Sequence, residues 1–302
     1  MVPQSRRSDW LFSFVILGVI WGSSFLFIKL SLEFLTPAGV AFWRTALGAL
    51  LLAVFVLVRR IKMPSTLKQW VLIWISGLFM SAIPAVLFSI AQQHVTSSLA
   101  SIMNAATPIF TVVVILIAFR EEKPKPNVLV GLIIGLIGVA TVLAIWQGFG
   151  ENDPISVLML VGAVTCYGIG TPFIRKFVTP FGLPLHSAVL VQVGTSALSL
   201  LPYYLLTGPL TTAPITFVPA AAIAALGLFG TGYAYVLFYS LIDKAGSAIA
   251  ASVTYITPLV GVLIGVILLG EKLSWHEPIG GIIVLLGAAI AQNRIKLPGA
   301  LR

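Results

Sequence analysis

The chain has 302 residues, of which 59% are hydrophobic and only 9% are charged, and its mean hydropathy is +1.06. Soluble domains carry roughly 25% charged residues, so this composition excludes a soluble globular protein and indicates a polytopic membrane protein. The formal net charge of +9 does not indicate a nucleic-acid partner, because the basic residues are scattered between apolar stretches, where they set orientation in the bilayer.

Ten stretches are apolar over a length that can cross a membrane, which takes roughly 20 residues. They are residues 11–30, 38–58, 70–90, 97–119, 127–146, 155–174, 186–206, 217–240, 247–269 and 278–293. Proline-containing breaks separate most of them, and no connection is long enough for a soluble domain. The sequence therefore predicts an all-α membrane protein with ten transmembrane helices, the first of which is not a cleaved signal.

Lysine and arginine gather in alternate connections. They occur at 59–68, 120–125 and 175–176, whereas the connection with Glu151 and Asp153 contains no basic residue. Because connections rich in lysine and arginine stay in the cytoplasm, we expect both termini to be cytoplasmic.

A long segment of the chain occurs twice. Residues 96–122 match residues 246–272 without a gap, which places Thr107-Pro108 on Thr257-Pro258 and Glu121 on Glu271. The same offset extends from 77 to 131, where about a quarter of the positions are identical. A match at a fixed period indicates a repeat, so we divide the chain into 1–150 and 151–302. Each half holds five spans, which predicts two repeats inverted relative to each other around a central cavity.

The fourth and ninth spans each carry a polar face interrupted by proline. Residues at helical spacing are Ser97, Ser101, Asn104, Pro108 and Thr111 in one, and Ser247, Ala251, Thr254, Pro258 and Gly261 in the other. Each proline removes a backbone hydrogen bond and so frees the carbonyl of Asn104 or Thr254. Paired kinks in inverted halves indicate a transport site. The alternative is a polar seam between closely packed helices.

Aromatic and hydroxyl residues on other spans extend this candidate site. The expected substrate-binding residues are Trp21, Ser24, Ser81, Ser101, Asn104, Tyr167, Thr231, Tyr235, Thr254 and Tyr255. The expected kink or gating positions are Pro84, Thr107, Pro108, Thr257 and Pro258. Such residues suit amphipathic organic molecules, including an ammonium group through cation–π contact. Tryptophan and tyrosine also serve in packing and in the interfacial belt.

Charge inside the predicted spans is nearly absent. The nine acidic residues fall in loops or at helix ends, which argues against proton coupling through a buried carboxylate. Arg44 is the deepest charge, and we expect it to pair with a helix terminus, with Glu33 or with a substrate carboxylate. The three histidines are isolated and Cys166 is the single cysteine, so we predict no metal, no cofactor and no intramembrane enzyme.

These motifs resemble the drug/metabolite transporter superfamily in its ten-helix EamA-type branch. The resemblance rests on Trp21-Gly22-Ser23-Ser24, Arg44, the paired Thr-Pro elements, the glutamate after the fourth and ninth spans, and the glycine-rich stretches GLIIGLIGV and GGIIVLLGA. It covers essentially the whole chain. The sixth span departs from the usual Trp-Ala, because it has Cys166-Tyr167 instead.

The resemblance implies a transporter of the bacterial inner membrane that exports or exchanges small metabolites, most commonly amino acids, including aromatic ones. It also implies a basket of helices with the fifth and tenth spans at the periphery, working by alternating access and facilitated diffusion. The expected partners are a small-molecule substrate and the lipid bilayer, with a possible homo-oligomer joined through the glycine-rich spans. The alternatives are a multidrug or nucleotide-sugar transporter of the same superfamily, a channel, or a non-transporting membrane subunit.

Overall fold

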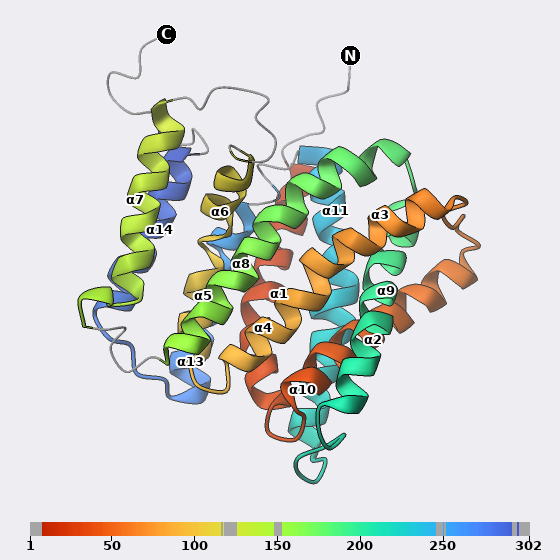
Figure 1. Ribbon diagram of the computed structural model, residues 1–302, viewed down its shortest axis with the longest axis horizontal. Helices are drawn as coiled ribbons and strands as arrows, with labels where there is room; N and C mark the ends of the chain where they lie inside the picture. The colour runs from red at the N-terminus through yellow and green to blue at the C-terminus, as the bar shows by residue number, and fades with distance from the viewer. Residues whose placement is uncertain are drawn as a thin grey trace.

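The computed structural model describes residues 8–115, 117, 126–147, 153–245, 250, 252–291 and 295, and the regular structure in these residues is entirely helical (Figure 1). The α-helices are α1 (Ser8–Ser31), α2 (Pro37–Val58), α3 (Leu67–Gly77), α4 (Ile83–Ala91), α5 (Ser97–Asn104), α6 (Thr107–Val114), α7 (Pro126–Val142), α8 (Pro154–Phe173), α9 (Leu185–Leu206), α10 (Phe217–Gly227), α11 (Ala234–Ala245), α13 (Thr257–Leu269) and α14 (His276–Ala291).

Seven helical segments in the described residues are long and apolar enough to cross a membrane. These are 10–31, 37–58, 67–91, 97–114, 154–181, 185–206 and 217–241, and three shorter apolar segments cover 129–142, 253–269 and 276–287. Each stretch predicted from the sequence overlaps one of these segments, and residues 116, 118–119, 247–249, 251 and 292–293 of those stretches lie outside the described residues. The chain is therefore a multi-pass membrane protein.

Polar residues at the first turn fix where several helices begin. Thr36 accepts a hydrogen bond from the amide of Gly39, and Thr96 accepts one from the amide of Leu99. Asp153 accepts bonds from the hydroxyl and the amide of Ser156 at the start of α8, and these bonds hold the pKa of the Asp153 carboxyl below its ordinary value. Such caps satisfy amides that have no partner within the helix.

The repeat is visible in the helix boundaries. α3 and α10 begin and end at positions separated by the sequence offset, and each continues into a π-helical segment, Leu78–Ala82 and Leu228–Tyr233 respectively. A Cβ atom at Gly77 would lie 2.6 Å from the carbonyl oxygen of Gln192 in α9, and one at Gly227 would lie 2.5 Å from Leu47 Cβ in α2. Each glycine thus lets the other half approach at the point where the helix changes its pitch.

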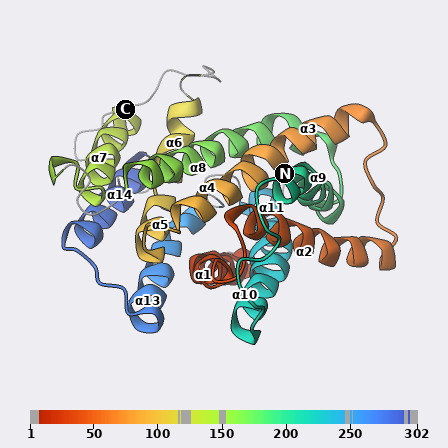
Figure 2. The same cartoon turned by 60° about the horizontal axis from the view of Figure 1, so that its bottom comes forward.

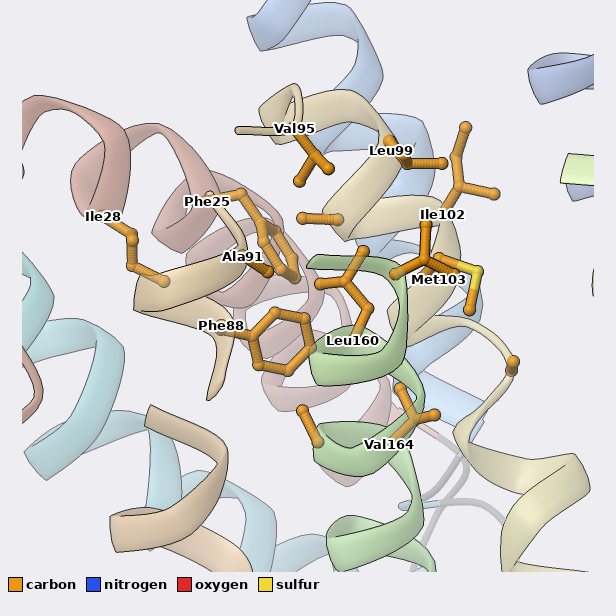
Figure 3. Packing of buried hydrophobic residues seen from close by; sticks show 14 of the residues in the cluster. Phe25, Ile28, Phe88, Ala91, Val95, Leu99, Ile102, Met103, Leu160 and Val164 are labelled. Atoms are coloured by element: carbon orange, nitrogen blue, oxygen red, sulfur yellow. The ribbon is translucent and has the colours of Figure 1, made fainter. Parts of the chain in front are cut away.

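The two halves interleave. α1 packs against α10, α11 and α13 from the second half, while α8 packs against α4 and α6 from the first half. α2 lies along α9, and α7 lies along α14 at one side of the molecule (Figures 1 and 2). The core that joins them is shown in Figure 3, where Phe25 of α1, Phe88 of α4 and Leu160 of α8 meet.

The peripheral pair α7 and α14 is held together by glycines. A Cβ atom at Gly287 would lie 2.3 Å from the amide nitrogen of Gly135, and one at Gly138 would lie 2.5 Å from the amide nitrogen of Val284. These glycines therefore serve close packing within one chain. The expectation that the glycine-rich spans join two protomers is wrong for these positions, because the neighbouring helix of the same chain already fills the contact.

Replacing Gly287 tests this packing. We expect Gly287→Ala to lower the free energy of unfolding by about 1–3 kcal/mol or more, because the added methyl group meets backbone that cannot yield. Gly281→Ala on the same helix is the control, since its Cβ would meet only a side chain, that of Ile102, at 3.3 Å, which is a milder contact than the 2.3 Å backbone contact at Gly287. Unfolding midpoints in detergent measure both, and equal midpoints would contradict the account.

Candidate functional site

A cavity lies between helices of both halves. Its wall is formed by Trp21, Ser24, Phe25, Ile28, Arg44, Met80, Phe88, Asn104, Thr107, Tyr167, Thr171, Tyr235, Phe238 and Thr254. The volume of the cavity is about 70 Å³. Most of the wall is aromatic or aliphatic, with amide and hydroxyl groups set into it.

The structure places much of the sequence-predicted site on this wall. Trp21, Ser24, Asn104, Tyr167, Tyr235 and Thr254 all line the cavity. Thr107, expected at a kink, lines it as well. Asn104 and Thr254 are the repeat partners whose backbone carbonyls lose an amide donor to proline. Both line a cavity and do not lie in a filled contact between helices.

Both Thr-Pro elements interrupt a helix and satisfy the interruption locally. α5 ends at Asn104, and α6 begins at Thr107 with Pro108 as its second residue. The hydroxyl of Thr107 donates to the carbonyl of Asn104 at 2.8 Å. In the second repeat the hydroxyl of Thr257 donates to the carbonyl of Thr254 at 2.9 Å. Each threonine thus replaces the amide hydrogen bond that the following proline cannot supply.

A contact between side chains joins the two interruptions. The amide nitrogen of Asn104 lies 3.4 Å from the hydroxyl oxygen of Thr257 and donates to it. Thr257 therefore bonds to its own helix and also receives a bond from the other repeat. Pro258 follows Thr257 as the second residue of α13, so both prolines stand where a helix restarts beside the cavity.

Pro84, the third kink residue, lies next to a contact from the other half of the chain. It has no amide hydrogen, and it follows the π-helical segment Leu78–Ala82, in which the amide of Ile83 donates to the carbonyl of Leu78. The hydroxyl of Tyr235 donates to the carbonyl of Met80 in this segment. The ring of Tyr235 packs edge-on against Trp21, with ring centroids 6.1 Å apart, so this interaction also positions two aromatic residues of the wall.

Arg44 is the single charged residue on the wall among the residues that the structure describes. It is 9% exposed, and its Nε donates to the hydroxyl of Thr231 at 3.3 Å. Thr231 in turn donates to the carbonyl of Leu226. Arg44 forms no ion pair with Glu33, so that expected pairing is wrong. The guanidinium is anchored at one nitrogen to a neutral hydroxyl and keeps its charge available toward the cavity.

Four expected substrate-binding residues do not lie on the wall. Ser81 accepts a hydrogen bond from the buried Gln192 behind it, and Ser101 donates to the carbonyl of Ser98 at the contact between α5 and α13. Thr231 holds Arg44, and Tyr255 packs beside the main core cluster. The hydroxyl groups of Ser81, Ser101 and Thr231 form hydrogen bonds within the helix bundle, and a hydroxyl in this role has the same sequence pattern as one that binds a substrate.

Sequence reasoning missed six wall residues, namely Phe25, Ile28, Met80, Phe88, Thr171 and Phe238. Thr171 follows Tyr167 by one helical turn, and this spacing is a signal that points to the same face. The apolar residues have no such signal, because a phenylalanine on the wall and one in the core occur in the same pattern.

A carboxylate ties the two halves together where α5 begins. Glu271, just after α13, accepts bonds at one oxygen from the amide and hydroxyl of Ser97, at 2.7 and 2.9 Å, and at the other oxygen from those of Ser98, at 3.0 and 2.6 Å. Negative charge is favourable at the N-terminus of a helix. The Nζ of Lys29 donates nearby to the carbonyls of Gln92 and Val95. The repeat partner Glu121 lies outside the described residues.

A membrane-spanning helical bundle with a polar cavity between interrupted helices in equivalent places of a repeat is the architecture of secondary transporters. A model of the EamA-like transporter family matches residues 9–144 and again residues 154–292. The chain belongs to this family, as its motifs indicated, and has the family's two-repeat architecture.

Several relatives match over nearly the whole chain. An uncharacterized transporter of Archaeoglobus fulgidus is 28% identical, covering 91% of this chain and 95% of its own length. The uncharacterized inner membrane transporter YedA of Escherichia coli K12 is 27% identical, covering 93% of this chain and 90% of its own length. One crystal structure shares the fold with a TM-score of 0.68 at 17% identity, covering 94% of this chain and 96% of that one.

The Thr-Pro account predicts a specific loss of stability. We expect Thr107→Val and Thr257→Val each to lower the free energy of unfolding by about 1–3 kcal/mol, because a buried carbonyl loses its donor. Thr165→Val is the matched control, since its hydroxyl bonds the carbonyl of Val161 in a part of α8 where no proline removes the amide donor. Chemical or thermal unfolding in detergent measures the stability of all three variants. A loss of stability in Thr165→Val as large as in the other two would contradict this explanation.

The contact of Glu271 predicts local protection of α5. We expect Glu271→Gln to lower the free energy of opening at the start of α5 by roughly 2 kcal/mol, because an amide retains one acceptor oxygen and loses the charge. Hydrogen exchange of the Ser97 and Ser98 amides measures this. Glu33→Gln, at an exposed position after α1, is the control. Unchanged exchange in Glu271→Gln would show that the carboxylate does not hold this end.

Proposed function

We propose that this protein carries small organic metabolites with a carboxylate group, foremost amino acids including aromatic ones, across the bacterial inner membrane in the direction of export or exchange. The observation that carries the proposal is the wall of the cavity. It combines one buried cation, Arg44, with six aromatic residues and the polar side chains at the two interruptions.

The chemistry of the wall selects the cargo. A guanidinium binds a carboxylate through a planar pair of hydrogen bonds, and Arg44 uses only its Nε on Thr231. The aromatic faces suit an apolar body and attract an ammonium group by cation–π interaction. A nucleotide-sugar would need several cations for its phosphates, and a cationic drug would be repelled by Arg44. The wall therefore favours a carboxylate with an apolar body over both alternatives.

Alternating access fits this geometry. Ten crossings arranged as two inverted repeats, 1–150 and 151–302, with both termini in the cytoplasm, would let the interrupted helices open the cavity to either side in turn. An enclosed space of about 70 Å³ requires the wall to move before an aromatic amino acid enters. The described carboxylates of Glu33, Asp153, Glu271 and Glu277 lie at helix ends, which supports facilitated diffusion down a gradient.

Reconstitution tests the proposal directly. Proteoliposomes loaded with unlabelled amino acid should accumulate the labelled compound from outside by counterflow, with an initial rate that saturates. Counterflow and saturation distinguish a carrier from a channel or a non-transporting subunit. Flux no greater than in empty liposomes across a panel of amino acids and related carboxylates would overturn the proposal.

The role of Arg44 can be separated from its contribution to folding. We expect Arg44→Gln to lower the initial rate for phenylalanine at least tenfold, because a charge-assisted hydrogen bond contributes about 1.5–3 kcal/mol. Phenethylamine, which has the same ring and ammonium group without the carboxylate, should be affected much less. Arg44→Lys, which keeps the charge, should retain part of the phenylalanine rate. An equal loss for both compounds would show that Arg44 acts on the fold.

A further inference from the structure

A second hollow lies on the outer face between α2, α3 and α9. Its wall consists of Phe42, Ala46, Ala49, Leu50, Ala53, Met63, Trp70, Leu190, Val191, Gly194, Thr195, Ala197, Leu198 and Leu201, and its volume is about 500 Å³. None of these residues lines the central cavity. The single hydroxyl on the wall, that of Thr195, already donates to the carbonyl of Val191 at 2.6 Å. The groove therefore presents hydrocarbon and no unmet polar group.

The groove is open to the outside of the helix bundle. Leu50 is 59% exposed and Leu198 is 69% exposed. α2 and α3 diverge toward the loop that joins them, with α9 between them (Figure 2). In a protein that spans a bilayer, such an apolar surface at membrane depth faces lipid chains.

Four exposed basic residues stand at the end of the groove near this loop. Arg59, Arg60, Lys62 and Lys68 flank the wall residues Met63 and Trp70 in the chain. The sequence contains no acidic residue between Glu33 and Glu121, so α2, α3 and their loop supply no carboxylate to neutralise them. This end of the groove therefore has an uncompensated positive charge.

Aromatic residues connect the charged end with the apolar wall. Trp70 donates its indole N–H to the carbonyl of Pro64 at 3.0 Å and lies on the groove wall. The guanidinium of Arg59 lies 5.9 Å from the centre of the Phe55 ring, which stacks on His186 with centroids 4.5 Å apart. Tryptophan with one wet edge and one apolar face is typical of the headgroup level of a membrane.

We propose that this groove binds one anionic phospholipid. An acyl chain fills the apolar hollow between α2 and α9, and the phosphate group lies at the basic end, against Arg60 and Lys62. Basic clusters next to membrane-spanning helices attract anionic headgroups, and the hollow gives a chain a fixed place beside them. The two features together distinguish a specific lipid from the general lipid shell.

Native mass spectrometry of the full chain in detergent tests the proposal, with dioleoyl phosphatidylglycerol and dioleoyl phosphatidylcholine added at equal concentration. We expect one phosphatidylglycerol to stay bound. The double variant Arg60→Gln and Lys62→Gln should bind it about 10- to 30-fold more weakly, from the contribution of each basic residue near an anionic lipid. The double variant of the exposed Lys244 and Lys272 to Gln is the control with equal charge loss.

Filling the groove tests its apolar part. Ala53→Phe should remove the bound lipid with all charges intact, while Leu57→Phe, 74% exposed on the same helix and not on the wall, should retain it. Size-exclusion profiles and unfolding midpoints check that the variants fold. Equal binding of phosphatidylcholine, an equal loss in the Lys244 and Lys272 control, or retention in Ala53→Phe would overturn the proposal. A lipid-free dimer that Ala53→Phe dissociates would overturn it as well.

Discussion

Backbone carbonyls in a membrane must find a donor within the protein, because hydrocarbon supplies none. Pro108 and Pro258 beside the cavity each remove one donor, and the freed carbonyl is bound in each case by the threonine that precedes the proline. Near Pro84, Tyr235 from the other half of the chain binds the carbonyl of Met80. The helices can therefore break at the cavity without exposing unsatisfied polar groups to lipid, and the remaining structure is arranged around these breaks.

The two halves of the chain depend on each other for their packing. Each half supplies helices that pack mainly against the other, so α1 lies against α13 and α8 lies against α6. The polar contacts follow the same rule, because Asn104 donates to Thr257 and Glu271 binds Ser97 and Ser98. Neither half alone has the complete wall, and neither supplies the partners of Asn104 and Glu271. The two repeats thus form a single structure, and the cavity is complete only where helices of both repeats come together.

The sequence predicted the features that depend on local pattern. The length of the apolar stretches predicted the helical segments, and the offset between the repeats predicted that α3 corresponds to α10. The positions of the prolines predicted where the helices are interrupted. Residues whose role depends on a partner from the other half were not predictable. Thr231 and Ser81 carry hydroxyl groups like those of binding residues, but these hydroxyl groups accept hydrogen bonds from Arg44 and Gln192. The partner of Arg44 lies in a segment far away in the sequence. The π-helical segments begin directly after Gly77 and Gly227, where another helix approaches closely, and the sequence alone does not reveal these contacts.

The repeats share the helix bounds of α3 and α10, but they differ in side-chain chemistry. Asn104 corresponds to Thr254, so an amide in the first repeat stands where the second has a hydroxyl. Ser97 and Ser98, which supply two hydroxyl donors to Glu271, correspond to Ser247 and Ala248, which contain only one hydroxyl. Hydrogen bonds to a charged group are among the stronger ones in a protein. In the proposed alternating-access cycle, two states that exchange the roles of the repeats would therefore differ in free energy, and the divergence between the copies would favour one of them.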